Sequence, residues 1–221
     1  MIKEIALILH VAGGMSGLLI GSLILGLKKG DKRHRLLGQW YVLSMALATL
    51  SGIGMAFWGD NQFLFLIGIF SFYLCYSGWR MARQKKGTTR TMRAVDISIA
   101  ILTLLLSVFM IASGIFDFGQ NKLIINPVLI IFGAASLIFS FNDTRLYLKP
   151  DADQILRKQW LNTHIGRMSG SYISALTAFL VVNLSGVLPP LLVWLGPSFI
   201  IGPLISRWVR KYTRPKASIQ Q

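Results

Sequence analysis

The stretch WLNTHIGRMSGSYISALTAFLVVN, from Trp160 to Asn183, decides the class of fold. It is long enough to cross a lipid bilayer as one α-helix, because about 20 mostly apolar residues suffice. Its first two turns nevertheless carry His164 and Arg167, which are costly at membrane depth and share one helix face at a spacing of three. A membrane-spanning helix with ionisable side chains near one end suggests a functional site.

The composition of the whole chain also indicates a membrane protein. Of its 221 residues, 53% are hydrophobic and only 14% are charged, whereas about a quarter of a soluble domain is charged. The net charge of +15 does not indicate nucleic-acid binding, because the basic residues separate apolar segments and form no single patch. The single cysteine, Cys75, excludes an internal disulfide, covalent c-type haem and a cysteine zinc cluster.

Apolar segments predict an all-α membrane domain of seven transmembrane helices, followed by a basic tail at 210–221. Charged stretches separate several of them, including KKGDKRHR, RQKKGTTRTMR and KPDADQILRKQ. The first segment is too long for the apolar part of a signal peptide and has no cleavage site, so a retained helix is expected. The predicted spans are residues 4–27, 35–58, 63–82, 94–116, 127–148, 160–184 and 190–209.

The distribution of basic residues predicts the orientation of the chain. All but two of the 23 lysines and arginines fall in or beside the ends that follow the first, third, fifth and seventh spans, the exceptions being Lys3 and Lys122. Positively charged loops remain on the cytoplasmic side of a membrane. The N-terminus is therefore predicted to lie outside and the C-terminus in the cytoplasm, with the protein in the plasma membrane.

Ionisable residues gather at the predicted cytoplasmic end of the spans. Arg167 lies too deep on its helix to remain unpaired, so Asp143 or Asp96 is expected to be its partner. His10 lies near the outer side, and it is expected either to bond a neighbouring carbonyl or to serve as a ligand or proton relay. The site is expected among the second, fourth, fifth and sixth spans, with the residues His34, Asp96, Asp143, Arg145, His164 and Arg167.

Three functions fit such a cluster. In the first, it binds or transports a small anionic, quinone-like or lipid ligand, with Arg167 as the anchor and the histidines moving protons. In the second, His34 and His164 are the axial ligands of a b-type haem in a membrane redox protein. In the third, the polar residues only lock helices together in a structural or accessory subunit without a ligand. Neither the usual metal-ligand spacings nor the HExxH, GxSxG and nucleotide-loop motifs are present.

Glycines at a spacing of four predict close contacts between helices. Gly13, Gly17 and Gly21 follow His10 on the first span and favour tight packing, either within the chain or in a homodimer. On the sixth span, Gly166 and Gly170 are expected to offer a similar smooth strip to a neighbouring helix.

Three stretches give the chain a resemblance to a known family. They are LHVAGGMSGLLIG around His10, HRLLGQWYVLSMALATLSG from His34 and WLNTHIGRMSGSYISALTAFLVVN around His164. Over nearly its whole length the sequence resembles bacterial multi-pass membrane proteins catalogued as domain of unknown function 2306. The resemblance implies a location in the bacterial inner membrane and marks all three histidines as candidate functional residues. It implies no established activity, substrate or cofactor.

Overall fold

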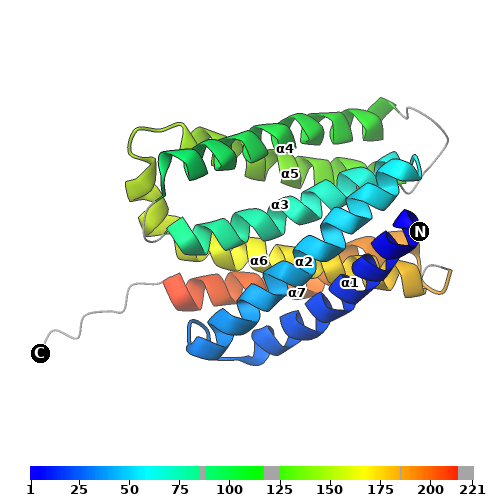
Figure 1. Ribbon diagram of the computed structural model, residues 1–221, viewed down its shortest axis with the longest axis horizontal. Helices are drawn as coiled ribbons and strands as arrows, with labels where there is room; N and C mark the ends of the chain where they lie inside the picture. Colours follow the sequence, from blue (N-terminus) through cyan, green and yellow to red (C-terminus); the bar gives the residue numbers. More distant parts are fainter. Residues whose placement is uncertain (85–87, 117–124, 185, 214–221) are drawn as a thin grey trace, which may run out of the picture.

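The computed structural model describes residues 1–84, 88–116, 125–184 and 186–213, which fold into seven α-helices (Figure 1). All seven are long and apolar enough to cross a membrane, as predicted, and the chain is a multi-pass membrane protein. Lys122 and residues 214–221 of the basic tail lie outside the described residues. The helices are α1 Ile2–Gly26, α2 Lys32–Trp58, α3 Gln62–Gln84, α4 Arg90–Phe116, α5 Ile125–Tyr147, α6 Ala152–Leu184 and α7 Pro190–Thr213.

Helix α6 begins two turns earlier than its apolar stretch predicted. The amides of Gln154 and Ile155 donate to the carbonyl of Asp151, so the segment predicted as a connection is helical. Ala152 and Leu156 lie on one face of this extension and are buried in a cluster at the end of the bundle. The extension is amphipathic, which explains why mean hydropathy alone placed it outside the helix.

Side-chain caps also move the starts of α2 and α4 about one turn earlier than predicted. A carboxylate oxygen of Asp31 accepts a hydrogen bond from the His34 amide at 2.7 Å, and the Thr89 hydroxyl accepts one from the Met92 amide at 3.2 Å. Such caps satisfy N–H groups that have no partner within the helix. His34 therefore lies in the first turn of α2, above its Asp31 cap.

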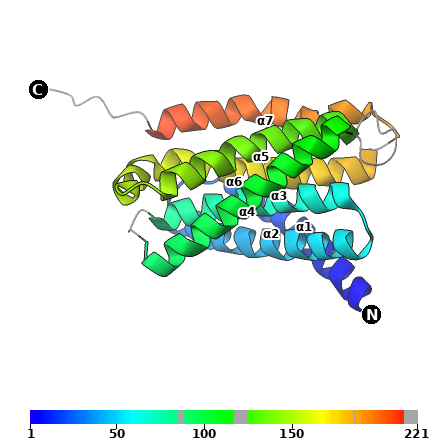
Figure 2. The same cartoon turned by 90° about the horizontal axis from the view of Figure 1, so that it is seen from above.

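The bundle consists of two helical hairpins around a central pair of helices. Helices α1 and α2 pack together, as do α4 and α5, and α3 packs against α2, α4, α5 and α6. Helix α7 packs against α6 and runs along one edge of the bundle (Figure 2). The side chains that reach the middle of the bundle therefore come mainly from α3 and α6.

The glycines of α1 form an internal contact. A Cβ atom on Gly13 would lie 2.7 Å from the carbonyl oxygen of Ser44, and one on Gly21 would lie 2.5 Å from the ring of Tyr172. Gly13, Gly17 and Gly21 are all buried. The structure thus confirms the predicted close packing within the chain, while a homodimer through these residues stays a prediction.

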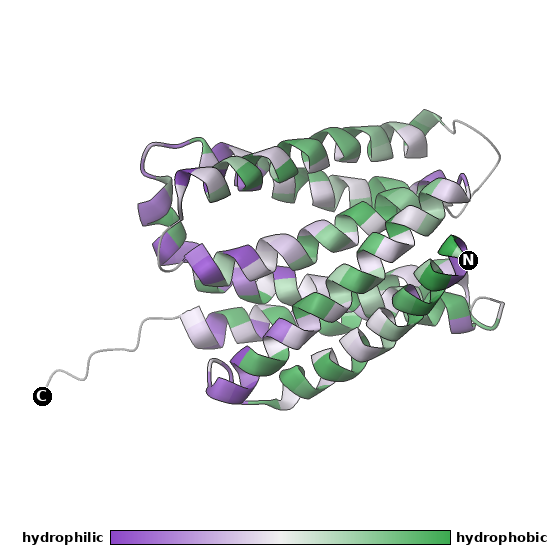
Figure 3. Cartoon of the chain, viewed as in Figure 1, coloured by the Kyte–Doolittle hydropathy of each residue, from purple (hydrophilic) through white to green (hydrophobic). Residues whose placement is uncertain are grey.

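Hydrophilic residues gather at one end of the bundle, where the described part of α7 ends (Figure 3). We call this the basic end and define it by the α1–α2 loop, the last turn of α3, the α5–α6 connection and the last turns of α7. Basic side chains from each of these segments lie there, among them Lys29, Arg83, Lys149 and Arg210. The predicted site residues other than His10 lie toward this end.

The adjacent glycines of α1 provide a test of the packing. Gly13→Ala should lower the free energy of unfolding by about 2 kcal/mol, because the added methyl group meets backbone atoms of α2 that cannot move away easily. Gly14→Ala is the matched control, since nothing lies within 4 Å of its added Cβ and alanine favours the helix. Thermal unfolding in detergent would measure both variants, and equal stability would contradict this arrangement of α1 and α2.

Candidate functional site

The structure divides the ionisable residues predicted for one site into three groups. Asp96 of α4 lies with residues of α3. Asp143 and Arg167 lie between α3, α5 and α6, and Arg145 lines the same cavity as this pair. His34 of α2 and His164 of α6 form the third group, in which His164 contacts α3. His10 is separate from all three, as predicted. Its Nδ1 lies 2.8 Å from the carbonyl oxygen of Ala48, which confirms the carbonyl contact.

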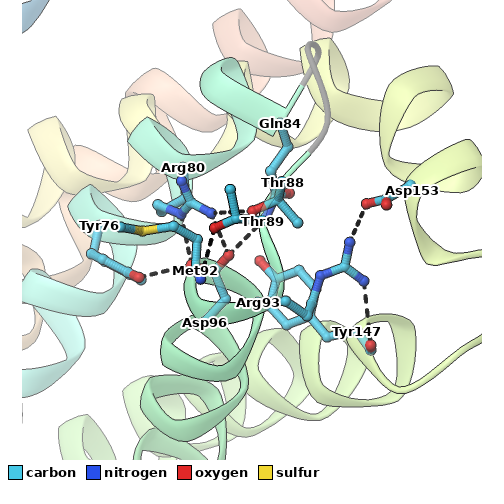
Figure 4. Close-up of polar contacts among 10 residues, drawn as sticks. All are labelled: Tyr76, Arg80, Gln84, Thr88, Thr89, Met92, Arg93, Asp96, Tyr147 and Asp153. Atoms are coloured by element: carbon cyan, nitrogen blue, oxygen red, sulfur yellow. Dashed lines mark hydrogen bonds and ion pairs between the residues drawn. The ribbon is translucent and has the colours of Figure 1, made fainter.

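Asp96 forms the tighter of two buried ion pairs. Arg80 donates to it from Nε at 2.7 Å and from Nη2 at 2.6 Å, reaching both carboxylate oxygens (Figure 4). The Tyr76 hydroxyl and the Gln84 amide donate to the same carboxylate at 2.7 and 3.0 Å. Asp96 therefore receives four hydrogen bonds, all from α3, in a two-nitrogen geometry that is among the strongest for such pairs.

A second ion pair adds to the contacts of the Asp96 group at the basic end. Arg93 of α4 forms an ion pair with Asp153 of α6, and its guanidinium lies 5.8 Å from the ring centre of Tyr147 on α5 (Figure 4). Together with the Asp96 group, these contacts join α3, α4, α5 and α6. Their chemistry is that of a structural clamp, because each charge has a partner and none lines the large cavity described below.

Asp143 and Arg167 form the second buried pair, which confirms the expected partner of Arg167. The Nη2 atom of Arg167 lies 3.1 Å from one carboxylate oxygen of Asp143 and 3.0 Å from the other. The Tyr73 hydroxyl donates to Asp143 at 2.5 Å, and Arg167 Nη1 donates to the Ser77 hydroxyl at 3.2 Å. The pair joins α5 and α6 to α3.

The geometry of this pair is looser than that of the Asp96 group. A single nitrogen of Arg167 reaches both oxygens of Asp143, and it also donates to the carbonyl of Phe139 at 3.3 Å. By contrast, Arg80 uses two nitrogens at shorter distances. Because parallel two-nitrogen contacts are stronger, the Asp143–Arg167 pair is the easier of the two to open.

This looser pair lines a cavity of about 1010 Å³ between α5, α6 and α7, with α3 at its back. The cavity is open to its surroundings, since several lining residues are exposed. Besides the ion pair, the polar residues near the basic end are Asn142, Arg145, Lys149, Gln159, Asn162 and Thr163. Farther from the basic end the lining is mainly apolar and includes Phe70, Ile131, Phe132, Ile173, Leu195 and Phe199.

Two glycines leave free space in the cavity wall. Nothing lies within 4 Å of a Cβ atom built on Gly166 or on Gly202, and both residues line the cavity. The predicted smooth strip on α6 is therefore wrong for Gly166, since an added Cβ there would meet open space and no neighbouring helix. Gly170 does have a neighbour, since its Cβ would lie 3.5 Å from Leu74 of α3.

His34 and His164 do not belong to the lining of this cavity. Nδ1 of His164 lies 2.9 Å from the carbonyl oxygen of Gly78, while Nδ1 of His34 is buried without a hydrogen-bond partner. The two imidazoles are close enough to interact electrostatically. Neither lines the large cavity, so that cavity supplies no histidine for a haem axial bond. Within the described residues no group of three or more His, Cys, Asp or Glu could hold a metal ion.

The sequence reasoning missed the polar face of α3. Tyr73, Ser77, Arg80 and Gln84 recur at helical spacing in the stretch FYLCYSGWRMARQ, and each contacts one of the buried carboxylates or the Arg167 guanidinium. This periodicity was a usable signal, because polar side chains on one face of a membrane helix indicate a polar interior. The predicted site accordingly lacks α3, which carries more of it than α2.

No protein-family model matches the chain, and no curated protein or solved structure is similar enough to count as a match. The resemblance to domain of unknown function 2306 therefore stays a prediction.

The Arg80–Asp96 pair should dominate the stability of the basic end. Arg80→Met should lower the free energy of unfolding by about 3 to 5 kcal/mol, because it leaves the buried carboxylate of Asp96 without its cation. Arg83→Met on the same helix is the control, since Arg83 is exposed. Chemical unfolding in mixed micelles would measure both variants.

The double variant Arg80→Met with Asp96→Leu separates the ion pair from simple packing. Its loss should be smaller than the sum of the two single losses, because removing both charges leaves no unpaired charge buried. Additive losses would show that the pair does not act as a unit.

Proposed function

We propose that the protein binds an amphipathic anion, of the kind formed by an acyl chain with an acidic head group, in the cavity between α5, α6 and α7. The observation that carries this proposal is the change in lining from polar and cationic near the basic end to apolar beyond it. A ligand with a charged head and an apolar tail matches such a wall along its whole length. The volume of about 1010 Å³ is at the upper end of the usual range for ligand sites.

The charges that line the cavity favour an anion. Arg145, Lys149 and Arg167 contribute three cations, against the single carboxylate of Asp143. Arg145 and Lys149 are exposed at the polar part of the cavity, where they meet a ligand first. A low-dielectric wall strengthens the positive potential that these charges create in the cavity, and this potential raises the local concentration of anions.

The apolar part favours a ligand that comes from the bilayer. Ile131 of α5 and Phe199 of α7 line the cavity and are 44% and 77% exposed, so the apolar wall reaches the surface of the bundle. Among the described residues, α5 and α7 make little direct contact with each other. In a membrane this surface faces the lipid chains, which supports sideways entry of an acyl chain between α5 and α7.

A purely structural role explains less of the molecule. The Asp96 group and the Arg93–Asp153 pair satisfy their own charges and join four helices without contributing to the cavity. Locking helices together does not require a large open space beside the second ion pair, nor glycines that leave its wall unfilled. The ligand-binding function accounts for both features.

The orientation belongs to this proposal. With the basic end in the cytoplasm of a bacterial cell, as the excess of lysine and arginine favours, the polar part of the cavity opens toward the cytoplasmic head groups of the plasma membrane. The N-terminus then lies outside. An anionic ligand would approach from the cytoplasmic leaflet.

Single cysteines should report this orientation. The native Cys75 is buried, so a membrane-impermeant maleimide should label only an introduced cysteine. Lys3→Cys should react in right-side-out vesicles and Arg157→Cys in inside-out vesicles, since both positions are exposed. The reverse pattern would place the basic end outside and contradict the proposed orientation.

Filling the cavity should weaken binding without unfolding the protein. Gly202→Leu places a side chain in the free space of the cavity wall and should weaken binding of decanesulfonate by about 10-fold or more, because it occupies the volume of the alkyl chain. Isothermal titration calorimetry of the detergent-solubilised protein would measure the affinity. Decyltrimethylammonium, which has the same chain and opposite charge, should bind more weakly than decanesulfonate.

Gly196→Leu is the matched control for this experiment. Gly196 lies on the same helix, also precedes a proline and also has nothing within 4 Å of its added Cβ, but it does not line the cavity. Its affinity for decanesulfonate should equal that of the natural protein. Equal binding by both leucine variants would show that the probe binds elsewhere, and the proposed function would fail.

A further inference from the structure

The Asp143–Arg167 pair is a buried ion pair that borders the cavity. Both residues line the cavity, and both are at least 93% buried. One nitrogen of Arg167 holds Asp143, and the same nitrogen also donates to a backbone carbonyl. An acidic group that enters the cavity can therefore compete with Asp143 for the guanidinium.

Charge balance limits what such an exchange can do. The buried Asp143–Arg167 pair is neutral by itself, because the other two cations of the cavity, Arg145 and Lys149, are exposed to solvent. An anion that binds beside Arg167 would therefore leave two negative charges against one positive charge in the buried part of the cavity. An uncompensated charge is expensive in a medium of low dielectric constant, where ionisable groups tend to become neutral. The excess disappears if Asp143 takes up one proton, because the anion and Arg167 then form the new neutral pair.

We infer that the protein binds its anion together with one proton, which Asp143 accepts as the anion takes over Arg167. The inference rests on the proposed function. The step forms one O–H bond on Asp143 and breaks the Asp143–Arg167 contact, while the proton comes from solvent. Net charge at the site is conserved, so anion and proton bind as a neutral unit.

The neighbours of Asp143 fit this role. From α3 the Tyr73 hydroxyl bonds one carboxylate oxygen at 2.5 Å, and from α6 Arg167 contacts both oxygens. Tyr147 on α5 and Asp96 on α4 also act on it electrostatically. The residues of α7 that line the cavity carry no titratable group. Arg167 is thus the cation in contact with Asp143, and losing it changes the charge balance directly.

The Asp96 group lacks the features needed for the same reaction. Its carboxylate is held by two nitrogens of Arg80 and by two further donors, and it does not line the cavity. An anion has no route to that guanidinium through the cavity. The contrast assigns proton uptake to Asp143.

Calorimetry in buffers of different ionisation enthalpy tests the inference. Decanesulfonate stays ionised near neutral pH, so any proton taken up must go to the protein. The natural protein should take up about one proton for each decanesulfonate that binds. The buffer supplies this proton, so the observed binding enthalpy should change in proportion to the ionisation enthalpy of the buffer. Asp143→Asn should bind the probe with no proton uptake, since its amide is neutral and leaves Arg167 available. Asp60→Asn, at the far end of the bundle, should keep the proton uptake of the natural protein.

Infrared difference spectroscopy gives a readout that does not depend on a variant folding. Binding of decanesulfonate to the natural protein should produce a C=O band of a protonated carboxylic acid. Binding without proton uptake and without this band would overturn the inference while leaving the proposed function intact. Proton uptake that persists in Asp143→Asn would also overturn it. A natural protein that does not bind the probe, or binds it equally after Gly202→Leu, would defeat the proposed function itself.

Discussion

A buried charge inside a membrane must have a partner, and this constraint organises the centre of the bundle. Helix α3 supplies the polar groups that meet it, with Arg80 for Asp96 on one side and the Tyr73 hydroxyl for Asp143 on the other. Because α3 packs against four other helices, its polar face fixes where α4, α5 and α6 can lie. The two ion pairs therefore help to hold the helices in place, independently of any function in ligand binding.

Close packing and open space are distributed unequally around this centre. Within each of the α1–α2 and α4–α5 hairpins, glycines let the two helices approach closely because they have no side chain. Examples are Gly13, which lies against α2, and Gly114, where a Cβ would lie 2.9 Å from the carbonyl oxygen of Asn126. In the cavity wall, Gly166 of α6 and Gly202 of α7 have nothing within 4 Å of an added Cβ. The same residue type thus closes one side of the bundle and leaves the cavity open on the other.

Much of the fold was predictable from the sequence, because long apolar segments have few alternatives to a membrane helix. That Arg167 pairs with an acid was also predictable, since a charge at that depth requires one, and the candidates were Asp143 and Asp96. What the sequence alone could not give was how the charges divide. Asp96 and Asp143 look equivalent along the chain, and only the packing of the helices pairs Arg80 of α3 with Asp96 and Arg167 of α6 with Asp143. The cavity depends on the gap between α5 and α7, which no local pattern encodes.

The difference between the two pairs follows from how many donors each carboxylate has and what surrounds it. Four donors from one helix hold Asp96 away from the large cavity, so opening that pair would expose two unsatisfied groups with nothing to replace them. Asp143 is held by Tyr73 and by one nitrogen of Arg167, at the wall of a space that can admit a competing acid. A pair of that kind stabilises the empty bundle and is also the contact that an anion can replace. The same constraint of neutrality that makes the pair structural then requires a proton whenever a ligand breaks it.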